Sequence, residues 1–176
     1  MKKILILLFS SILAIPFYQS IHASVADSSS YGFTIKQEYT IKDPADSVFK
    51  NLVYNIGKWW DSEHTYSHDA RNLTIQPFAG GCFCERLKDS GSVRHMTVIN
   101  IVPGKTLRME GGLGPLQSMA VNAILTFSIS QSCNNAELEV TYTVGGYAPG
   151  GLQKMAPIVD RVLGQQMKRM IEYDEK

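Results

Sequence analysis

The chain has 176 residues, of which 44% are hydrophobic, and its 17 basic and 16 acidic residues give a formal net charge of +1. This balance, without any run of Lys or Arg, lacks the electrostatic footprint of a nucleic-acid-binding protein and offers little attraction to an anionic membrane surface. The length fits one domain of ordinary size, which can bury enough core to fold without a disulfide framework.

The first 26 residues are predicted to be a secretory signal peptide. Lys2 and Lys3 precede an apolar run that is interrupted by Pro16 and is shorter than the roughly 20 residues of a membrane-spanning helix. Ala23 and Ala26 both offer the small residue that a signal peptidase needs, and cleavage after Ala26 is preferred. Loss of the two lysines leaves 15 basic and 16 acidic residues. We expect a periplasmic or secreted protein without a membrane span after cleavage.

The next segments predict a short lead, a strand and two helices. Residues 27–32 are rich in serine, which favours a flexible lead, and residues 33–41 alternate apolar and polar side chains, as in a half-buried strand. Asp43 and Pro44 then predict a helix start, with Asp43 as N-cap and Pro44 as the first helical residue. Two short helices are expected before the polar segment 61–69, which is typical of a loop.

The remainder predicts six further strands and one long helix. Short turns separate the strands, so neighbours along the chain must be antiparallel. Apolar residues from Leu152 to Ile171 follow one stripe of a helix that also contains Gln166, and Pro157 belongs in its first turn or at a kink. The strands are expected at 72–77, 80–87, 92–102, 105–111, 119–130 and 136–145.

This order of elements predicts one α+β domain over residues 33–173. A curved antiparallel sheet of about seven strands would wrap around the C-terminal helix, with the two short helices after the first strand closing one end. A cavity would remain between the sheet and the helix wherever side chains do not fill the space.

Five stretches of the sequence resemble the SRPBCC superfamily, which includes START and Bet v-like proteins. They are WW at 59–60, GGCFCE at 80–85, RHMTV at 94–98, VPGKTLRMEGGLGPLQ at 102–117 and VTYTVGGYAPGGLQKMAPIVDRVLGQQMKRM at 140–170. The resemblance covers the chain from about residue 33 to residue 170. It is nearest to bacterial proteins of the polyketide cyclase/dehydrase-like or activator-of-heat-shock-ATPase-like types.

The resemblance implies a helix-grip, START-like fold with a deep apolar cavity. The same fold hosts lipid carriers, receptors, cyclases and co-chaperone modules, so it does not fix the function. The heat-shock co-chaperones are cytosolic, and the predicted export therefore argues against that partner.

Aromatic and polar residues of the expected strands are candidates for a ligand pocket. Glu85 shares a strand face with Phe83, and a buried carboxylate there needs a partner such as His95 or Arg108. Arg108 itself is expected on the solvent face. Aromatic side chains could stack on a flat or apolar ligand, or simply pack in the core. The residues expected to line the pocket are Trp59, Trp60, Phe83, Glu85, His95, Met109, Tyr142, Tyr147, Met155 and Val159.

The segment GGCFCE places Cys82 and Cys84 on one face of a strand. Their Cα atoms would be roughly 6.5 Å apart, near the outer limit for a disulfide. Three interpretations stay open: two buried small residues, a disulfide of Cys133 with Cys82 or Cys84, or a metal or redox role. The preceding glycines are expected to permit close approach or bending of the sheet.

Two histidines could suggest zinc, but their context does not. His64 and His68 have the spacing that places two imidazoles on one helix face, whereas the region is predicted to be a loop. A zinc site needs three or four ligands. We therefore expect neither a metal nor another cofactor.

Three functions are compatible with the sequence. The first is an exported carrier of a small hydrophobic or amphipathic ligand, either lipid-like or aromatic, acting as a monomer or weak dimer. The second is a cyclase- or dehydratase-like enzyme that uses His95 and Glu85 as an acid/base pair in the same cavity. The third is an envelope interaction module with a filled core.

Overall fold

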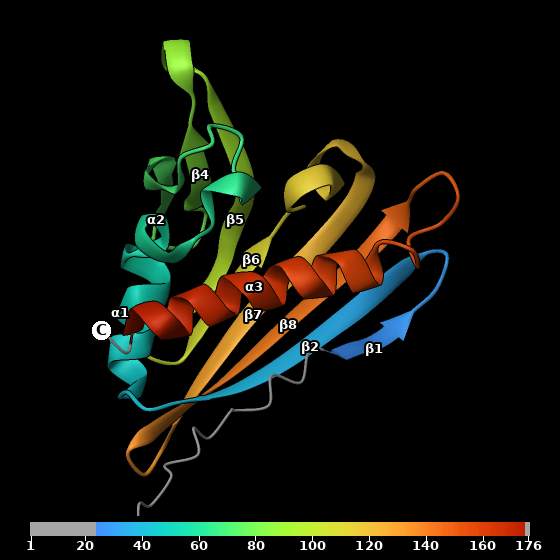
Figure 1. Ribbon diagram of the computed structural model, residues 1–176. Helices are drawn as coiled ribbons and strands as arrows, with labels where there is room; N and C mark the ends of the chain where they lie inside the picture. The colour runs from blue at the N-terminus through green and yellow to red at the C-terminus, as the bar shows by residue number, and fades with distance from the viewer. Residues whose placement is uncertain (1–23, 175–176) are drawn as a thin grey trace, which may run out of the picture.

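The protein is a single curved sheet that grips one long helix. A computed structural model describes residues 24–174, in which eight antiparallel strands follow the order β1-β2-β8-β7-β6-β5-β4-β3. Figure 1 shows α3 (Ala156–Asp174) crossing the inner face of this sheet. The expected α+β helix-grip fold is confirmed. The strands are β1 (Ser24–Ser28), β2 (Gly32–Ile41), β3 (Leu73–Ile75), β4 (Cys82–Arg86), β5 (Ser92–Val102), β6 (Thr106–Glu110), β7 (Ala120–Ser132) and β8 (Asn135–Tyr147).

Two short helices close one end of the sheet, as expected. They are α1 (Ala45–Tyr54) and α2 (Ile56–Trp59), and both contact α3 (Figure 1). Pro44 is the N-cap of α1 rather than its first helical residue, because its ψ of 144° is extended. The N–H of Ala45 is satisfied from the sheet instead, by donating to Oε1 of Gln131 at 2.8 Å.

The segment before β2 differs from the expected flexible lead over 27–32. β1 pairs antiparallel with β2, and the N–H of Ser29 donates to the carbonyl of Gly32 to form the turn between them. The serines have little intrinsic preference for a strand, but an exposed edge of β2 offers unpaired backbone groups that a neighbouring segment can satisfy. Edge pairing therefore outweighs local composition here.

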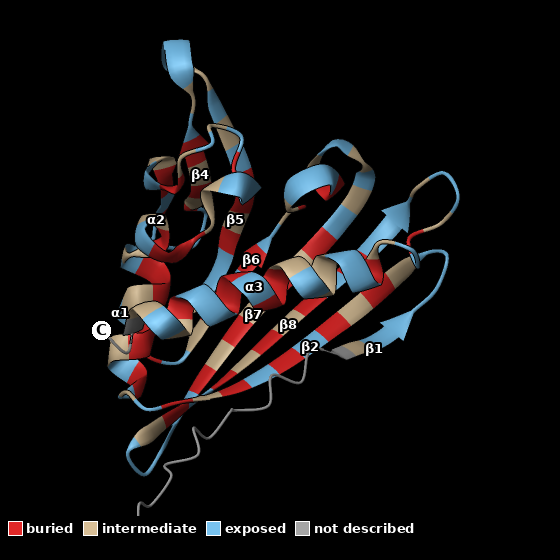
Figure 2. Ribbon diagram, in the orientation of Figure 1, coloured by how far each residue is buried: buried red, intermediate tan, exposed pale blue. Residues whose placement is uncertain are grey.

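The core lies between the inner face of the sheet and the helices. Figure 2 shows buried positions alternating with others along β2, β7 and β8. Pro157 occupies the second position of α3, in the first turn, where its missing N–H costs no helical hydrogen bond. Within residues 24–174, none of the helices has both the length and the apolar character to cross a bilayer.

Candidate ligand pocket

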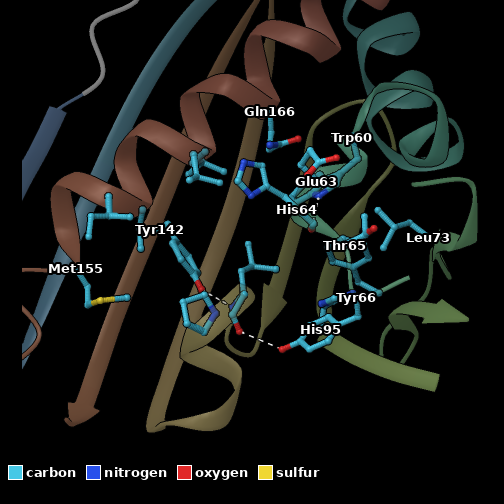
Figure 3. A pocket seen from close by; sticks show the side chains of 18 of the residues that line it. Trp60, Glu63, His64, Thr65, Tyr66, Leu73, His95, Tyr142, Met155 and Gln166 are labelled. Atoms are coloured by element: carbon cyan, nitrogen blue, oxygen red, sulfur yellow. Dashed lines mark hydrogen bonds between the residues drawn. The ribbon is translucent and has the colours of Figure 1, made fainter. Parts of the chain in front are cut away.

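A cavity of about 480 Å³ lies between α3, the inner face of the sheet and the loop that follows α2 (Figure 3). Its walls are mostly apolar and aromatic, and the exposed Glu63 is the one Asp, Glu, Lys or Arg among the described residues that line it. A cavity of this size and character suits a small organic molecule.

The structure places part of the expected set in the cavity wall. Of the ten expected residues, six line the cavity: Trp60, Phe83, His95, Tyr142, Met155 and Val159. The other four, Trp59, Glu85, Met109 and Tyr147, do not.

The four other residues have different surroundings for physical reasons. Trp59 is buried in α2, and its indole N–H donates to the carbonyl of Asn51 at 3.0 Å. Met109 lies in β6 and is buried in the hydrophobic core of the protein. Tyr147 ends β8 beyond the region covered by the helix, and it is 72% exposed.

Glu85 is fully buried beside the cavity, underneath the loop. Its carboxylate accepts the backbone N–H groups of Tyr66, at 3.1 Å, and Ser67. It also lies 3.0 Å from Nε2 of His95, the partner that the sequence suggested, while Arg108 donates to the Thr126 hydroxyl on the exposed face. Glu85 thus ties the loop to the sheet and orients the histidine.

A bulge in β5 turns His95 inward. Phe83 pairs with Met96 and Cys84 pairs with Arg94, so His95 is an extra residue in β5. His95 and Met96 are consecutive and yet both buried, whereas a regular strand would direct one of them outward.

The Glu85–His95 pair is an ionised carboxylate with a neutral imidazole. Burial raises the pKa of Glu85, but hydrogen bonds from Ser67, Tyr66 and His95 outweigh it and hold this pKa below its usual range. Burial lowers the pKa of His95, and Glu85 offsets only part of that effect. Because a carboxylate can only accept, the Nε2–H of His95 donates to Glu85, and Nδ1 keeps its lone pair.

Tyr142 contributes a second polar group to the cavity. Its hydroxyl accepts the N–H of Leu113 at 3.0 Å, drawn in Figure 3. Burial raises the pKa of Tyr142 to about 12, so the hydroxyl keeps its proton at neutral pH. A proton on this oxygen is a potential donor to a bound molecule.

Gln166 is the least expected polar residue of the wall. Its side chain is fully buried in α3, and Oε1 accepts the N–H of Asp61 at 2.8 Å. Within residues 24–174, Nε2 of Gln166 has no hydrogen-bond partner. Buried amide groups are rarely left in this state.

The loop and the segment after β6 contribute lining residues that were not predicted from the sequence. The loop supplies Glu63, His64, Thr65, Tyr66 and His68, and the other additional residues are Leu73, Leu113, Gly114, Pro115, Ile158, Val162, Leu163 and Gln166. One signal was present in the sequence, since a glutamine interrupts an otherwise apolar helix stripe at Met155, Val159, Val162 and Gln166.

Two tyrosine hydroxyls hold the glycine-rich segment after β6 against the cavity. The hydroxyl of Tyr66 lies 2.9 Å from Oε1 of Gln117 and 3.4 Å from the carbonyl of Gly114. Together with the Leu113–Tyr142 bond, these contacts fasten this segment to the loop that follows α2 and to β8.

The cysteines do not pair as predicted. Cys82 and Cys84 form a disulfide with each other, whereas Cys133 is free and exposed, so the prediction of a bond to Cys133 was wrong. Two strands lie between β4 and the β7–β8 turn that holds Cys133, which places it out of reach. The register of β4 and β5 shifts at Phe83, and the two Cα atoms are 5.3 Å apart, closer than in a regular strand.

The two faces of β4 therefore have different roles. Phe83 and Glu85 are buried toward the cavity side, and the disulfide lies half-buried on the other face. Gly81 permits the predicted close approach, because a Cβ there would lie 2.2 Å from the carbonyl oxygen of Gln76. Over residues 24–174, no three His, Cys, Asp or Glu side chains are grouped so that they could hold a metal ion.

Solved structures of other proteins share the fold of this chain at low sequence identity. No protein-family model matches the chain, and no curated protein matches it. An uncharacterised protein from Rhizobium leguminosarum superimposes with a TM-score of 0.59 at 17% identity, covering 82% of this chain and 95% of its own.

Two further solved structures superimpose on this chain. DynU16, from the dynemicin biosynthetic locus, gives a TM-score of 0.58 at 14% identity over 81% of this chain and 47% of its own. Ara h 8.0201 gives 0.58 at 12% identity over 81% and 97%. At these identities the likeness establishes a shared fold alone, the α+β helix-grip arrangement described above.

Proposed function

We propose that the protein is an exported carrier that holds a small hydrophobic or amphipathic molecule between the sheet and α3. The observation that supports this most is the cavity of about 480 Å³ with its largely apolar wall. Burial of apolar ligand surface would supply about 25 cal/mol per Å² before the entropic costs of binding. A filled-core interaction module would leave no such space, so the cavity argues against that alternative.

The carrier proposal can be tested by filling the cavity. Val162 lines it from α3, and Gln165 lies on the exposed side of the same helix. Val162→Trp should weaken the binding of an apolar fluorescent dye at least tenfold, whereas the matched Gln165→Trp should bind as the wild type does. Native mass spectrometry of protein purified from its own host should reveal a bound molecule. A wild-type protein that is always empty and binds no dye would end the proposal.

A cyclase- or dehydratase-like activity is the second candidate. His95 lines the cavity as a neutral imidazole that Glu85 orients, which is the arrangement of a general base. Glu85 would hold His95 in place rather than touch the substrate, since it does not line the cavity. Loss of water from β-hydroxy ketone probes should then follow a pH profile that His95→Ala abolishes. Turnover that persists in His95→Ala would assign the base elsewhere.

Export is supported by the sequence and by the cysteines. The basic and apolar N-terminal segment lies outside the described residues, apart from its last positions. A disulfide between Cys82 and Cys84 fits an oxidising compartment. We propose cleavage after Ala23 rather than Ala26, because a cut after Ala26 would remove the first three residues of β1. The N-terminal sequence of protein recovered from the envelope or medium decides between the two sites.

A further inference from the structure

We infer that the cavity selects a neutral ligand bearing a carbonyl or hydroxyl oxygen, and that Nε2 of Gln166 donates to this oxygen. This inference rests on the carrier function proposed above and specifies the chemistry of its ligand. Gln166 lies on α3 at the end of the cavity near Trp60 and His64 (Figure 3).

The orientation of the Gln166 amide is fixed by its neighbour. The N–H of Asp61 can only donate, and it lies 2.8 Å from Oε1 of Gln166. Exchanging the amide oxygen and nitrogen would set two donors against each other. Nε2 is therefore the amide atom left without a partner on a side chain that lines the cavity.

A buried donor without an acceptor is unfavourable, and a ligand can remove that cost. Gln166 is fully buried, and Nε2 has no partner within residues 24–174. A donor of this kind weakens the binding of a ligand that brings only apolar atoms, and it strengthens the binding of one that brings an acceptor. The missing partner thus belongs to the bound molecule.

The charge of the cavity favours a neutral acceptor over a carboxylate. Among the described residues that line it, none is Lys or Arg, and the exposed Glu63 adds negative charge. An anionic group at Gln166 would be buried without a Lys or Arg counter-ion, which is costly. Ketones, esters and alcohols on an apolar skeleton satisfy the donor without that cost.

The test compares three fluorescent probes that share one apolar skeleton: ethylpyrene, acetylpyrene and pyrenecarboxylate. Wild-type protein should bind acetylpyrene about tenfold more tightly than ethylpyrene, and pyrenecarboxylate more weakly than acetylpyrene. Gln166→Glu keeps an oxygen for the Asp61 N–H but offers no donor when ionised, and Gln166→Met removes both functions. Both variants should lose the preference for the ketone, while the exposed neighbour variant Gln165→Met should retain it.

Ethylpyrene binding reports in each variant that the cavity is intact, so a folding defect is recognised. If no pyrene binds to the wild type, the carrier function fails together with this inference. Equal binding of ethylpyrene and acetylpyrene to the wild type would overturn the inference alone. Tightest binding of pyrenecarboxylate would also overturn it. So would a preference that persists in Gln166→Met, because another donor such as the Tyr142 hydroxyl would then hold the oxygen.

Discussion

Two buried glutamines on opposite sides of α3 differ in how completely their amide groups are hydrogen-bonded. On the β2 side, Nε2 of Gln37 donates to the backbone carbonyl and the carboxylate of Asp160 at 2.9 and 2.8 Å, and Oε1 accepts from the Tyr39 hydroxyl at 2.7 Å. On the cavity side, Gln166 is equally buried, but half of its amide has no partner within residues 24–174. Both side chains are fully buried, so burial alone does not distinguish them.

The difference separates a polar group that supports the fold from one that awaits a ligand. A complete buried network fixes how α3 sits on β2, because every donor and acceptor has a partner. An incomplete one stabilises little by itself and gains from a molecule that completes it. The predictions below test this contrast, starting with the largest expected effect.

Loss of the Glu85 carboxylate should be the most damaging change on the cavity side. Glu85→Ala leaves the N–H groups of Tyr66 and Ser67 and the imidazole of His95 without their shared acceptor. We expect the free energy of unfolding to fall by about 3 kcal/mol in urea denaturation. Glu110→Gln, on the exposed face, should change it by less than about 0.5 kcal/mol. A Glu85→Ala loss as small as that control would show that the loop does not depend on this tie.

The two glutamines should respond differently to the same substitution. Gln37→Leu leaves Asp160 and the Tyr39 hydroxyl without their hydrogen-bond partner. The substitution should lower the free energy of unfolding by about 2 kcal/mol. Gln166→Leu loses one bond to Asp61 but also removes an unsatisfied donor, so the unliganded protein should change by less than about 1 kcal/mol. Equal losses in urea denaturation would contradict the contrast.

The disulfide should have a smaller effect, because it closes a very short loop. The double variant Cys82→Ser, Cys84→Ser should lose about 1.5 kcal/mol of unfolding free energy and little ligand affinity, since both residues face away from the cavity. Without reductant, a thiol reagent should label one cysteine per unfolded chain in the wild type and none in Cys133→Ser. Labelling of three cysteines would show that the bond is absent.

The smallest predicted effect is on pH dependence. The pKa of His95 is lower in the folded than in the unfolded protein, so its contribution is complete above pH of about 6.5 and is lost as pH falls through the folded pKa. The urea midpoint should therefore decrease on acidification below neutrality, and His95→Gln should flatten this decrease. The exposed His64→Gln should preserve the wild-type slope. Glu85, with its lowered pKa, is expected to lose its contribution at lower pH still.

Most of the fold was predictable, because strand alternation and the helix stripe are local signals. Seven of the strands and the three α-helices are found near their expected residues. β1 was not predictable from its serines, since its stability comes from pairing with an edge that the sequence does not reveal. Pairing of the two neighbouring cysteines likewise depends on the irregular register at Phe83.

The residues of the site were harder to predict from the sequence than the fold. Phe83 and Tyr142 were expected in the wall from strand alternation, and His95 was expected there as a polar strand residue that could partner Glu85. The bulge that turns His95 inward could not be foreseen. Loop residues such as Tyr66 enter the cavity through tertiary contacts with Glu85, for which no periodic signal exists. Gln166 was placed on the inward stripe, but its missing partner is a property of geometry alone.

The hydrogen bonds of Tyr66 and Tyr142 to the segment after β6 bear on how fast a ligand exchanges. We expect a molecule that enters the cavity to pass the segment that Tyr66 and Tyr142 hold through Gln117 and Leu113. Entry and exit would then share one barrier, set by opening of this segment on the microsecond-to-millisecond timescale. Tyr66→Phe would speed both rates alike and leave the equilibrium constant nearly unchanged. Residence time in this protein would thus be adjustable separately from affinity.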